Sequence, residues 1–447
     1  MISVHIRKGF RLNISGEPST RLEELPKPDK VALLPEKIPF LKPRLKVQVG
    51  DRVKIGTPLI EDKRNPEVVF LSPGGGRIAE INFGPRRVIR EISVVLDHDE
   101  AYEAFPIFSP DQLDKMARQD LVKTLQTGGL WPLLRELPFR DIATPDFTPP
   151  AIIVDLDATE PFQPAAAVYL KEHIDLFEFG LKILQKLSST VLISAAADNA
   201  FVRQQLNGYL THIYQGAYPA NDPGVLLYHI KKTPDDNRAW YLNGQEVLLL
   251  ARLLQTGRYP IARTIALGGH LVDNQTHLLT RAGVPLDHIT RGRADISEAA
   301  RYIVGGIFRG YTGSQDSYLG FYETALTLIS EGAEKEFLGF ARPGFDKPSR
   351  SRAFLSAFNP ALMPMDCNRH GEERACINCG YCIQVCPVDI LPQFTYKSVL
   401  AEEIEEALAH GLLDCVECGL CTYVCPSKIE LCATLINTKK AYYLEQV

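Results

Sequence analysis

Cysteine is absent from residues 1–366 of this 447-residue chain. All ten cysteines lie between Cys367 and Cys432. A disulfide scaffold distributes its bridges through the whole fold, so this clustering excludes such a scaffold. It indicates metal or redox chemistry near one end of the chain instead.

Long apolar runs are absent too. No stretch of about 18 apolar residues occurs, so the sequence predicts no membrane-spanning helix. Residues 1–9 contain no apolar segment of the kind that a secretory signal needs. We therefore expect a cytoplasmic protein, a class that includes peripheral subunits on the inner face of the cell membrane.

The chain also lacks an excess of positive charge. Its 49 Lys and Arg and 54 Asp and Glu give a formal net charge of −5, which offers no overall basic field for nucleic acid. The acidic excess lies after residue 375, where 9 Asp and Glu accompany 4 Lys and Arg. A hydrophobic content of 45% is that of a folded globular protein, and the length predicts about three domains.

Eight of the cysteines form two runs with the spacing C-x2-C-x2-C-x3-C-P. The first run is Cys376, Cys379, Cys382 and Cys386 followed by Pro387, and the second is Cys415, Cys418, Cys421 and Cys425 followed by Pro426. This spacing is typical of bacterial ferredoxins that bind two [4Fe–4S] clusters. Zinc prefers two C-x2-C pairs separated by a longer loop, so we favour iron–sulfur clusters over a pair of zinc sites.

The spacing also predicts which cysteines bind together. Three closely spaced thiolates bind three irons of one cubane, whereas the fourth cysteine lies too far along and binds the other cluster. The predicted ligands are therefore Cys376, Cys379, Cys382 and Cys425 for cluster 1, and Cys415, Cys418, Cys421 and Cys386 for cluster 2. Such neighbouring clusters suit electron relay, although purely structural clusters are the alternative.

Two cysteines and one helix complete this region. Cys432 has a helical spacing with Ile429 and Ile436, so we expect a small core residue, and for Cys367 we favour a buried, inert thiol. Between the runs, a helix is expected with Val399, Leu400, Ile404 and Leu408 on one face and Glu402, Glu403, Glu405 and Glu406 on the other. The acidic face is either a solvated surface, which we favour, or a surface that attracts a basic partner.

Residues 30–97 are expected to form short strands joined by Gly and Pro turns, and they resemble the barrel-sandwich family of biotinyl and lipoyl carriers. Lys63 lies where those carriers bear a modified lysine. Residues 64–67 should extend this loop, so we favour an unmodified structural barrel. The glycines at 74–76 lack the pattern of a phosphate-binding loop.

Residues 150–275 alternate between strand and helix patterns, which predicts a mostly parallel α/β sheet. Strands are expected at 151–155, 190–194, 224–228 and 263–267, and helices at 164–187 and 245–255. The loops at 155–157 and 268–270 follow strands, where such folds bind ligands, but neither has a nucleotide-binding fingerprint. We expect His270 to be a structural hydrogen-bonding residue. Residues 283–340 suggest a small α+β unit, followed by a proline-rich linker over 341–366.

Five segments in this order resemble one known family. They are IRKGF at 6–10, EDKRNP at 61–66, GLWPLLR at 129–135, EFLGF at 336–340 and CPSK at 425–428. The whole chain resembles the A subunit of the sodium-translocating NADH:quinone reductase (Nqr), and it resembles the C subunit of the Rnf complex in its order of domains. Typical members of the first family lack the paired cysteine runs, whereas the Rnf subunit has them.

The resemblance implies a multidomain α/β and α+β fold. The domains expected are a barrel-sandwich domain over 1–110, a Rossmann-like parallel-sheet domain over 111–280, a β-grasp-like unit over 281–345 and a C-terminal helical two-cluster ferredoxin-like module over 346–447. The Rnf subunit carries a glycine-rich loop for flavin and NADH where this chain has TGGLWP at 127–132. We therefore expect neither FMN nor NAD to bind this subunit.

The resemblance also implies an oxidoreductase function. We expect an electron-transfer subunit of a membrane-associated, cation-translocating NADH:quinone oxidoreductase, with integral-membrane and flavoprotein subunits as partners and ubiquinone and sodium as the associated quinone and ion. No catalytic residue and no quinone-binding residue is assigned. The alternatives are an Rnf-type C subunit that accepts electrons from NADH through FMN, and a non-catalytic assembly module with structural clusters.

Overall fold

A computed structural model describes residues 1–234, 236–294, 299–332, 338, 343–345, 355–368 and 372–446. The segment at 336–340, apart from Leu338, and much of the predicted linker at 341–366 lie outside the described residues. The boundaries expected at residues 110, 280 and 345 remain predictions.

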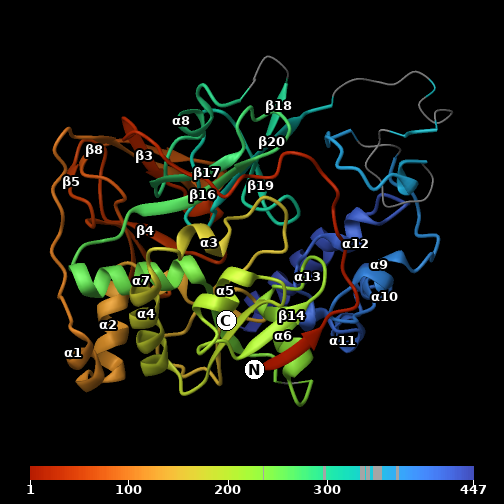
Figure 1. Cartoon of the computed structure of the whole chain (residues 1–447), viewed down its shortest axis with the longest axis horizontal. Coiled ribbons are helices and arrows are strands. Elements are labelled where there is room, and N and C mark those ends of the chain that lie inside the picture. Colours follow the sequence, from red (N-terminus) through yellow and green to blue (C-terminus); the bar gives the residue numbers. More distant parts are fainter. Residues whose placement is uncertain are drawn as a thin grey trace.

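A seven-stranded sheet lies at the centre of the α/β region (Figure 1), in the order β1-β14-β13-β12-β15-β10-β11. Its strands are β1 (Ile2–His5), β10 (Arg135–Leu137), β11 (Asp141–Ile142), β12 (Ile152–Asp155), β13 (Val191–Ala196), β14 (His212–Gln215) and β15 (Ala239–Asn243). The five strands from β1 to β15 in this order are parallel, and β10 and β11 are antiparallel additions. The predicted, mostly parallel sheet is therefore confirmed.

Side chains alternate along each strand, so apolar residues point to both faces of this sheet. Helices cover each face and bury those residues. On one face, Ile152 and Val154 pack in a core with helices α2 (Arg118–Thr127), α4 (Ile174–Leu187) and α7 (Gly244–Thr256). On the other face, Ile153 packs with Leu226 of α6 (Pro223–Ile230). The remaining helices of this part are α1 (Pro110–Lys115), α3 (Ala166–Tyr169) and α5 (Ala200–Gln205).

The expected elements of this region were partly right. The strands at 151–155 and 190–194 and the helix at 245–255 are confirmed by β12, β13 and α7. The helix expected at 164–187 is divided into α3 and α4, and the strand expected at 224–228 is wrong because these residues lie in α6. The strand expected at 263–267 exists, but it belongs to a different sheet.

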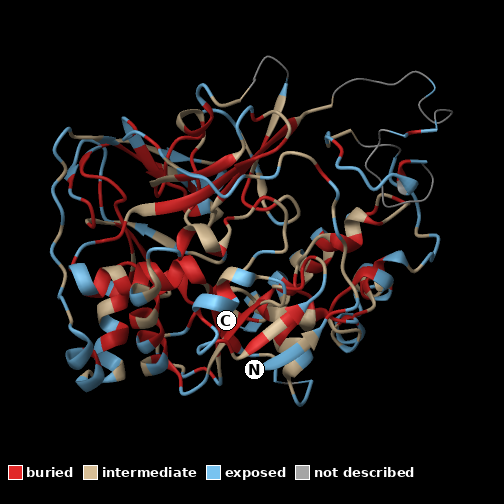
Figure 2. Cartoon of the chain, viewed as in Figure 1, coloured by how far each residue is buried: buried red, intermediate tan, exposed pale blue. Residues whose placement is uncertain are grey.

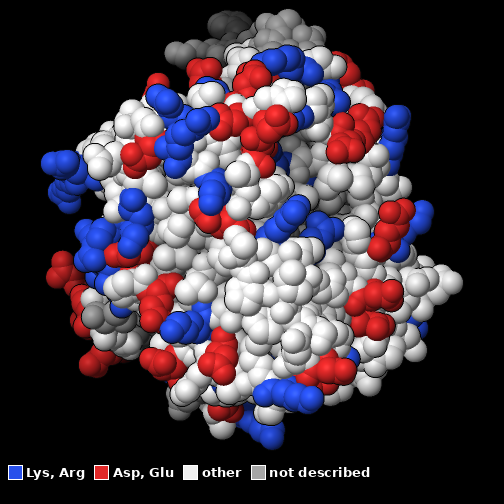
Figure 3. Space-filling view, turned by 90° about the vertical axis from the view of Figure 1, so that its left-hand side faces the viewer, with Lys and Arg blue, Asp and Glu red and all other residues white. Residues whose placement is uncertain are grey.

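The barrel-sandwich region has two sheets, in the orders β3-β9-β8-β5 and β4-β6-β7. Its strands are β3 (Lys30–Leu33), β4 (Pro43–Leu45), β5 (Arg52–Val53), β6 (Pro58–Asp62), β7 (Asn65–Leu71), β8 (Gly76–Phe83) and β9 (Ile89–Leu96). Fully buried Leu59, Phe70 and Ile92 fill the space between the sheets. On the side of the molecule that carries this region and helices α1 and α2, Lys and Arg are interspersed with Asp and Glu (Figure 3).

The turn that carries Lys63 differs from the expectation. Only Lys63 and Arg64 separate β6 from β7, so the hairpin is tight rather than extended. Lys63 is exposed, whereas Arg64 forms ion pairs with Asp62 at 2.8 Å and with Asp141 at 2.5 Å. Because Asp141 belongs to β11, the hairpin is anchored to the α/β region instead of standing free.

A six-stranded mixed sheet follows, in the order β19-β18-β20-β16-β17-β2. Its elements are β2 (Leu22–Glu24), β16 (Ala262–Gly268), β17 (Thr276–Arg281), β18 (Ala300–Val304), β19 (Tyr311–Gly313) and β20 (Ala325–Ser330), with helix α8 (Leu286–Thr290). The buried residues concentrate along the strands of the sheets and on the inner sides of α4 and α7 (Figure 2). The N-terminal segment thus supplies β1 to one sheet and β2 to another.

The C-terminal module is helical, as expected, with α9 (Tyr381–Val385), α10 (Pro392–Leu400), α11 (Ile404–Ala409), α12 (Leu420–Tyr423) and α13 (Leu431–Gln446). The single helix expected between the cysteine runs is wrong, because residues 401–403 interrupt it. Leu400 is 64% exposed, so the expected apolar face is not fully buried, whereas the four glutamates are exposed. The module packs on the sheet edge through Ile6 and Tyr214.

Candidate functional site

The two cysteine loops have the same local backbone. Asn378 and Gly380 of the first loop have φ angles of 56° and 76°, and Glu417 and Gly419 of the second have 59° and 76°. Gly380 precedes the short helix α9, and Gly419 precedes the short helix α12. The two loops therefore make the same turn into a helix. A left-handed backbone at these positions favours glycine, which explains why both runs contain it after their second cysteine.

Each loop surrounds one cavity, and each cavity receives a cysteine from the other run. The first cavity is lined by Cys376, Cys379, Cys382 and Cys425. The second is lined by Cys386, Cys415, Cys418 and Cys421, with Cys382 and Cys432 also in its wall. Among the described residues, no three His, Cys, Asp or Glu side chains converge closely enough to hold a single metal ion. The cysteines instead lie around the two cavities.

The two cavities differ in exposure. Cys379 is exposed at the first cavity, whereas Cys386, Cys415 and Cys421 at the second are 8%, 8% and 9% exposed. Burial raises the pKa of the Cys386, Cys415 and Cys418 thiols to about 12. Such thiols are poor nucleophiles when free, and a bound iron or other cation is what makes a buried thiolate stable.

The remaining two cysteines divide between core and surface. Cys432 is 7% exposed and packs with Ile429 and Leu431, so the expected core position is confirmed. Cys367 is only half-buried, which corrects the expectation of a buried thiol. Its pKa is raised by burial.

Cationic side chains from distant parts of the chain contact the second loop. Arg140 and Arg309 each donate a hydrogen bond to the Val416 carbonyl oxygen at 3.1 Å. Lys439 donates to the Cys415 carbonyl oxygen at 2.8 Å. The Tyr218 hydroxyl donates to the Cys418 carbonyl oxygen at 2.9 Å. The loop is therefore held by the α/β region, the mixed sheet and helix α13 together.

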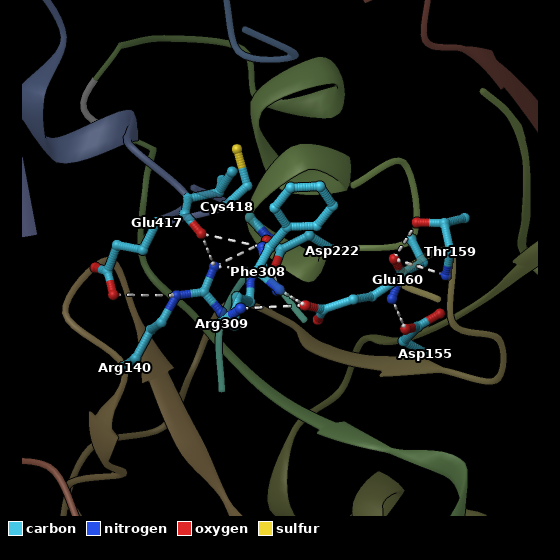
Figure 4. A network of polar contacts seen from close by, with 12 residues as sticks. Arg140, Asp155, Thr159, Glu160, Asp222, Phe308, Arg309, Glu417 and Cys418 are labelled. Carbon is cyan, nitrogen blue, oxygen red and sulfur yellow. Dashed lines mark hydrogen bonds and ion pairs between the residues drawn. The ribbon is translucent and has the colours of Figure 1, made fainter. Parts of the chain in front are cut away.

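Two carboxylates balance part of this positive charge. Asp222, which is fully buried, pairs with Arg140 at 2.9 Å and with Arg309 at 2.6 Å (Figure 4). These guanidinium groups hold the pKa of Asp222 at about 2 although burial alone would raise it. Glu417 pairs with Lys439 at 2.8 Å and lies 4.0 Å from Arg140.

A larger cavity of about 300 Å³ adjoins this group of charges. It lies at the carboxyl ends of β12 and β15, where the strand order reverses and where open α/β sheets bind ligands. Its polar lining includes Arg135, Arg140, Asp155, Asp157, Glu160, Asp222, Asn243, Arg309 and Glu323, with Tyr169, Tyr218, Tyr241 and Tyr322. The cavity combines aromatic surface with both hydrogen-bond donors and hydrogen-bond acceptors.

Burial controls the protonation of the carboxyl groups in this cavity. It raises the pKa of Asp155 well above its usual range and that of Glu323 to about 7. The pKa of Glu160 is also raised by burial, against the effect of Arg309. Glu160 Oε1 accepts hydrogen bonds from the Phe308 and Arg309 amides (Figure 4).

The loops considered in the sequence have different surroundings. The loop at 155–157 contributes to the 300 Å³ cavity. His270 contacts the Ser330 hydroxyl at 3.0 Å, which confirms a hydrogen-bonding role. Trp131 is fully buried, donates to the Ala143 carbonyl and lies edge-on to Trp240. The Gly75 amide donates to Glu100 at 2.7 Å, so a carboxylate already occupies the position that a phosphate would need.

Sequence reasoning did not identify Arg140, Asp222, Arg309 or Lys439. They come from segments more than 80 residues apart and belong to no motif of fixed spacing. Only Asp222 has a local signal, because Asp-Pro before an apolar run marks a helix start.

Comparison with known proteins agrees with this architecture. The family described as the NqrA N-terminal barrel-sandwich hybrid domain matches residues 4–97, and the NqrA second alpha/beta domain matches residues 116–259. A 4Fe-4S dicluster domain matches residues 375–429. Fold and site thus define a multidomain redox protein in which a ferredoxin-type module is attached to a barrel-sandwich and an α/β domain.

Curated relatives identify the family. The A subunit of the Na(+)-translocating NADH-quinone reductase of Histophilus somni (strain 2336) is 33% identical over 92% of this chain and 92% of its own length. The corresponding protein of Neisseria meningitidis serogroup C (strain FAM18) is 34% identical with the same coverage. The chain belongs to this family of oxidoreductase-complex subunits, and the expected barrel-sandwich, α/β and cluster-domain fold class is confirmed.

Part of the chain is also similar in structure to a hydrogenase. Crystal structures of an NAD+-reducing [NiFe]-hydrogenase, air-oxidized and H2-reduced, each cover 52% of this chain and 52% of their own at 12% and 11% identity. The TM-score is 0.36 in both cases. In the described part of the chain, no helix has the length and apolar character needed to cross a membrane.

Proposed function

We propose that this protein is an electron-transfer subunit that relays electrons through two [4Fe–4S] clusters. The observation that supports this proposal is the arrangement of the eight motif cysteines around two adjacent cavities, with each predicted set of four ligands in the wall of one cavity. Thiolates are the ligands of such clusters. When bound, each cluster supplies one-electron transfer, and the chain holds and insulates it.

The ligand sets cross between the two runs. Cys376, Cys379, Cys382 and Cys425 hold cluster 1, and Cys415, Cys418, Cys421 and Cys386 hold cluster 2. The two cavities share Cys382 in their walls, so the clusters are close neighbours. Short separation favours rapid electron exchange over a purely structural role.

The relatives' names give the proposed complex. They belong to an NADH-quinone reductase that translocates sodium. We propose that this chain docks peripherally on the inner face of the cell membrane, with integral-membrane and flavoprotein subunits as partners and a quinone as the acceptor of the complex. The relation to the Rnf C subunit is part of this proposal, since that protein has paired cysteine runs.

Metal analysis tests the proposal. Protein purified without oxygen should be brown and contain about eight iron and about eight labile sulfide per chain, as two cubanes require. Stoichiometric zinc without sulfide would overturn it. Clusters present but not reducible by dithionite would favour a non-catalytic assembly module.

One observation favours a second candidate, the Rnf-type enzyme that takes electrons from NADH through FMN. The 300 Å³ cavity lies at the carboxyl ends of the parallel strands and is bordered by Tyr218 and Arg309, which contact the second cysteine loop. Against it, residues 130–131 are packed in the core where that enzyme needs an open glycine-rich loop. Binding of FMN by the isolated chain distinguishes the two candidates.

A further inference from the structure

The two cysteine loops have the same backbone but different electrostatic surroundings. Ile377 and Val416 occupy equivalent positions, since each follows the first cysteine of its run. Ile377 is 68% exposed, whereas Val416 is 4% exposed and its carbonyl oxygen accepts from Arg140 and Arg309. At this position, therefore, the first loop faces water, whereas two guanidinium groups contact the second loop.

Lys439 extends the difference. Its side chain is 3% exposed and its Nζ lies 2.8 Å from the Cys415 carbonyl oxygen. The side chains that line either cavity are uncharged apart from the cysteines, and at the first cavity Cys382 contacts the Gln393 amide group. The difference lies outside the cavity lining, where Arg140, Arg309 and Lys439 contact backbone carbonyls of the second loop; we call these three residues the cation group.

Reduction of a cluster adds one negative charge to it. A positive charge held nearby in a low-dielectric region stabilises the reduced form, and cluster potentials follow local charge, hydrogen bonding and exposure. Asp222 pairs with Arg140 and Arg309, and Glu417, which belongs to the loop itself, pairs with Lys439, so two carboxylates offset two of the three cations and a net charge of +1 remains. One buried charge within about 10 Å changes the ratio of reduced to oxidised cluster by roughly tenfold, or 59 mV for one electron.

We propose that the cation group raises the reduction potential of the cluster bound by Cys415, Cys418, Cys421 and Cys386 above that of the other cluster. This inference rests on the proposed function, because it needs both clusters to be bound. Arg140, Arg309 and Lys439 act as positioning residues that touch the loop and not the iron. Electrons then enter at the exposed loop of Cys379 and come to rest on the buried cluster beside the 300 Å³ cavity.

Redox titration monitored by EPR tests the proposal on the full-length protein with both clusters bound. The two signals are assigned by the change that each shows in the Cys379→Ser and Cys418→Ser variants. In the unaltered protein, the signal of the buried cluster should become reduced first. Reduction of the exposed cluster first would overturn the proposal.

Substitutions of opposite sign give the sharper test. Arg309→Gln should shift the buried cluster toward the oxidised form by roughly tenfold, Asp222→Asn should shift it toward the reduced form, and Arg309→Lys should restore most of the effect. A role in packing alone would not give opposite signs. Equal shifts of both signals, or shifts of the same sign in Arg309→Gln and Asp222→Asn, would overturn the proposal.

A matched control separates charge from general destabilisation. Arg281 forms a buried ion pair with Glu100 at 2.9 Å and also joins two parts of the fold, but it contacts neither cysteine loop. Arg281→Gln should leave both potentials unchanged.

Iron and sulfide are measured in every variant. Lack of iron in the unaltered protein would refute the proposed function, whereas loaded clusters with unmoved potentials would refute only this inference.

Discussion

Cys425 belongs to the second cysteine run but lies on the first cavity, together with Cys376, Cys379 and Cys382. Cys425→Ser should therefore damage the proposed cluster 1, although its nearest cysteines in sequence are the proposed ligands of cluster 2. EPR of the reduced variant measures this loss. Cys386→Ser is the matched control and should damage cluster 2. Loss confined to the cluster of Cys415, Cys418 and Cys421 in the Cys425 variant would show that the ligand sets do not cross.

Glu323 gives a prediction about pH. Its Oε2 atom is buried and has no hydrogen-bond partner among the described residues, and burial raises the pKa of this carboxyl from 4.5 to about 7. Between these two values, the folded protein binds more protons than the unfolded chain, so the free energy of unfolding falls as pH rises. Above about pH 7 this decrease levels off, after a total loss of roughly 1–3 kcal/mol.

Glu323→Gln should remove this contribution because the amide carries no charge at any of these pH values. Urea unfolding at pH 5 and pH 8 should show a smaller decrease in stability for the variant than for the unaltered protein. An unchanged pH dependence would mean that another group is responsible, and Asp155, whose pKa is also raised, would be the next to test.

At the scale of elements, the β6–β7 hairpin is held by one of its two turn residues. Arg64 is 21% exposed and pairs with Asp62 and Asp141, and Asp141 also accepts from the Tyr443 hydroxyl at 2.9 Å. Arg64→Ala leaves two buried carboxylates without their cation and should lower the unfolding free energy by roughly 3 kcal/mol. Denaturant unfolding measures the change.

The neighbouring residue provides the control for that variant. Lys63 is exposed, so Lys63→Ala should change stability by less than about 0.5 kcal/mol. We also predict that Lys63 carries no biotinyl or lipoyl group, because its hairpin is anchored to β11 rather than free to move. An added mass on the peptide that contains Lys63, detected by mass spectrometry, would contradict this prediction.

Local patterns predicted some elements and not others. Strands β12 and β13 could be predicted from their apolar β-branched residues, and helix α7 from its period. The apolar run at 224–228 looked like a strand, yet the Asp222 side chain accepts from the Gly224 amide and Pro223 opens a helix. The apolar run alone permits either a strand or a helix, and the Asp222 cap two residues before it favours the helix.

Pairing between distant segments was beyond sequence reasoning. Strand β1 pairs with β14, and β2 pairs with β17, at separations of more than 200 residues. No period or motif encodes such a partner. The same limit applies to the site: the cysteines could be predicted because their spacing is itself the motif, whereas Arg140, Arg309 and Lys439 meet only after the domains pack.

At the scale of the whole molecule, the question is where electrons from NADH enter. A hydride carrier delivers two electrons together, while a [4Fe–4S] cluster accepts one, so a flavin must lie between them. A flavin site in this fold needs a loop whose backbone approaches phosphate closely. Leu130 and Trp131 are fully buried at that loop and pack in the core of the barrel-sandwich and α/β regions.

We therefore predict that the isolated chain binds neither FMN nor NADH tightly and does not oxidise NADH with artificial acceptors. Its clusters should be reduced by dithionite or by a flavoprotein partner only. Stopped-flow mixing with NADH, followed by the cluster absorbance, measures this directly, and dithionite serves as the positive control. Rapid bleaching by NADH alone would show that the chain takes electrons from NADH without a partner and would favour the Rnf-type enzyme over the relay function.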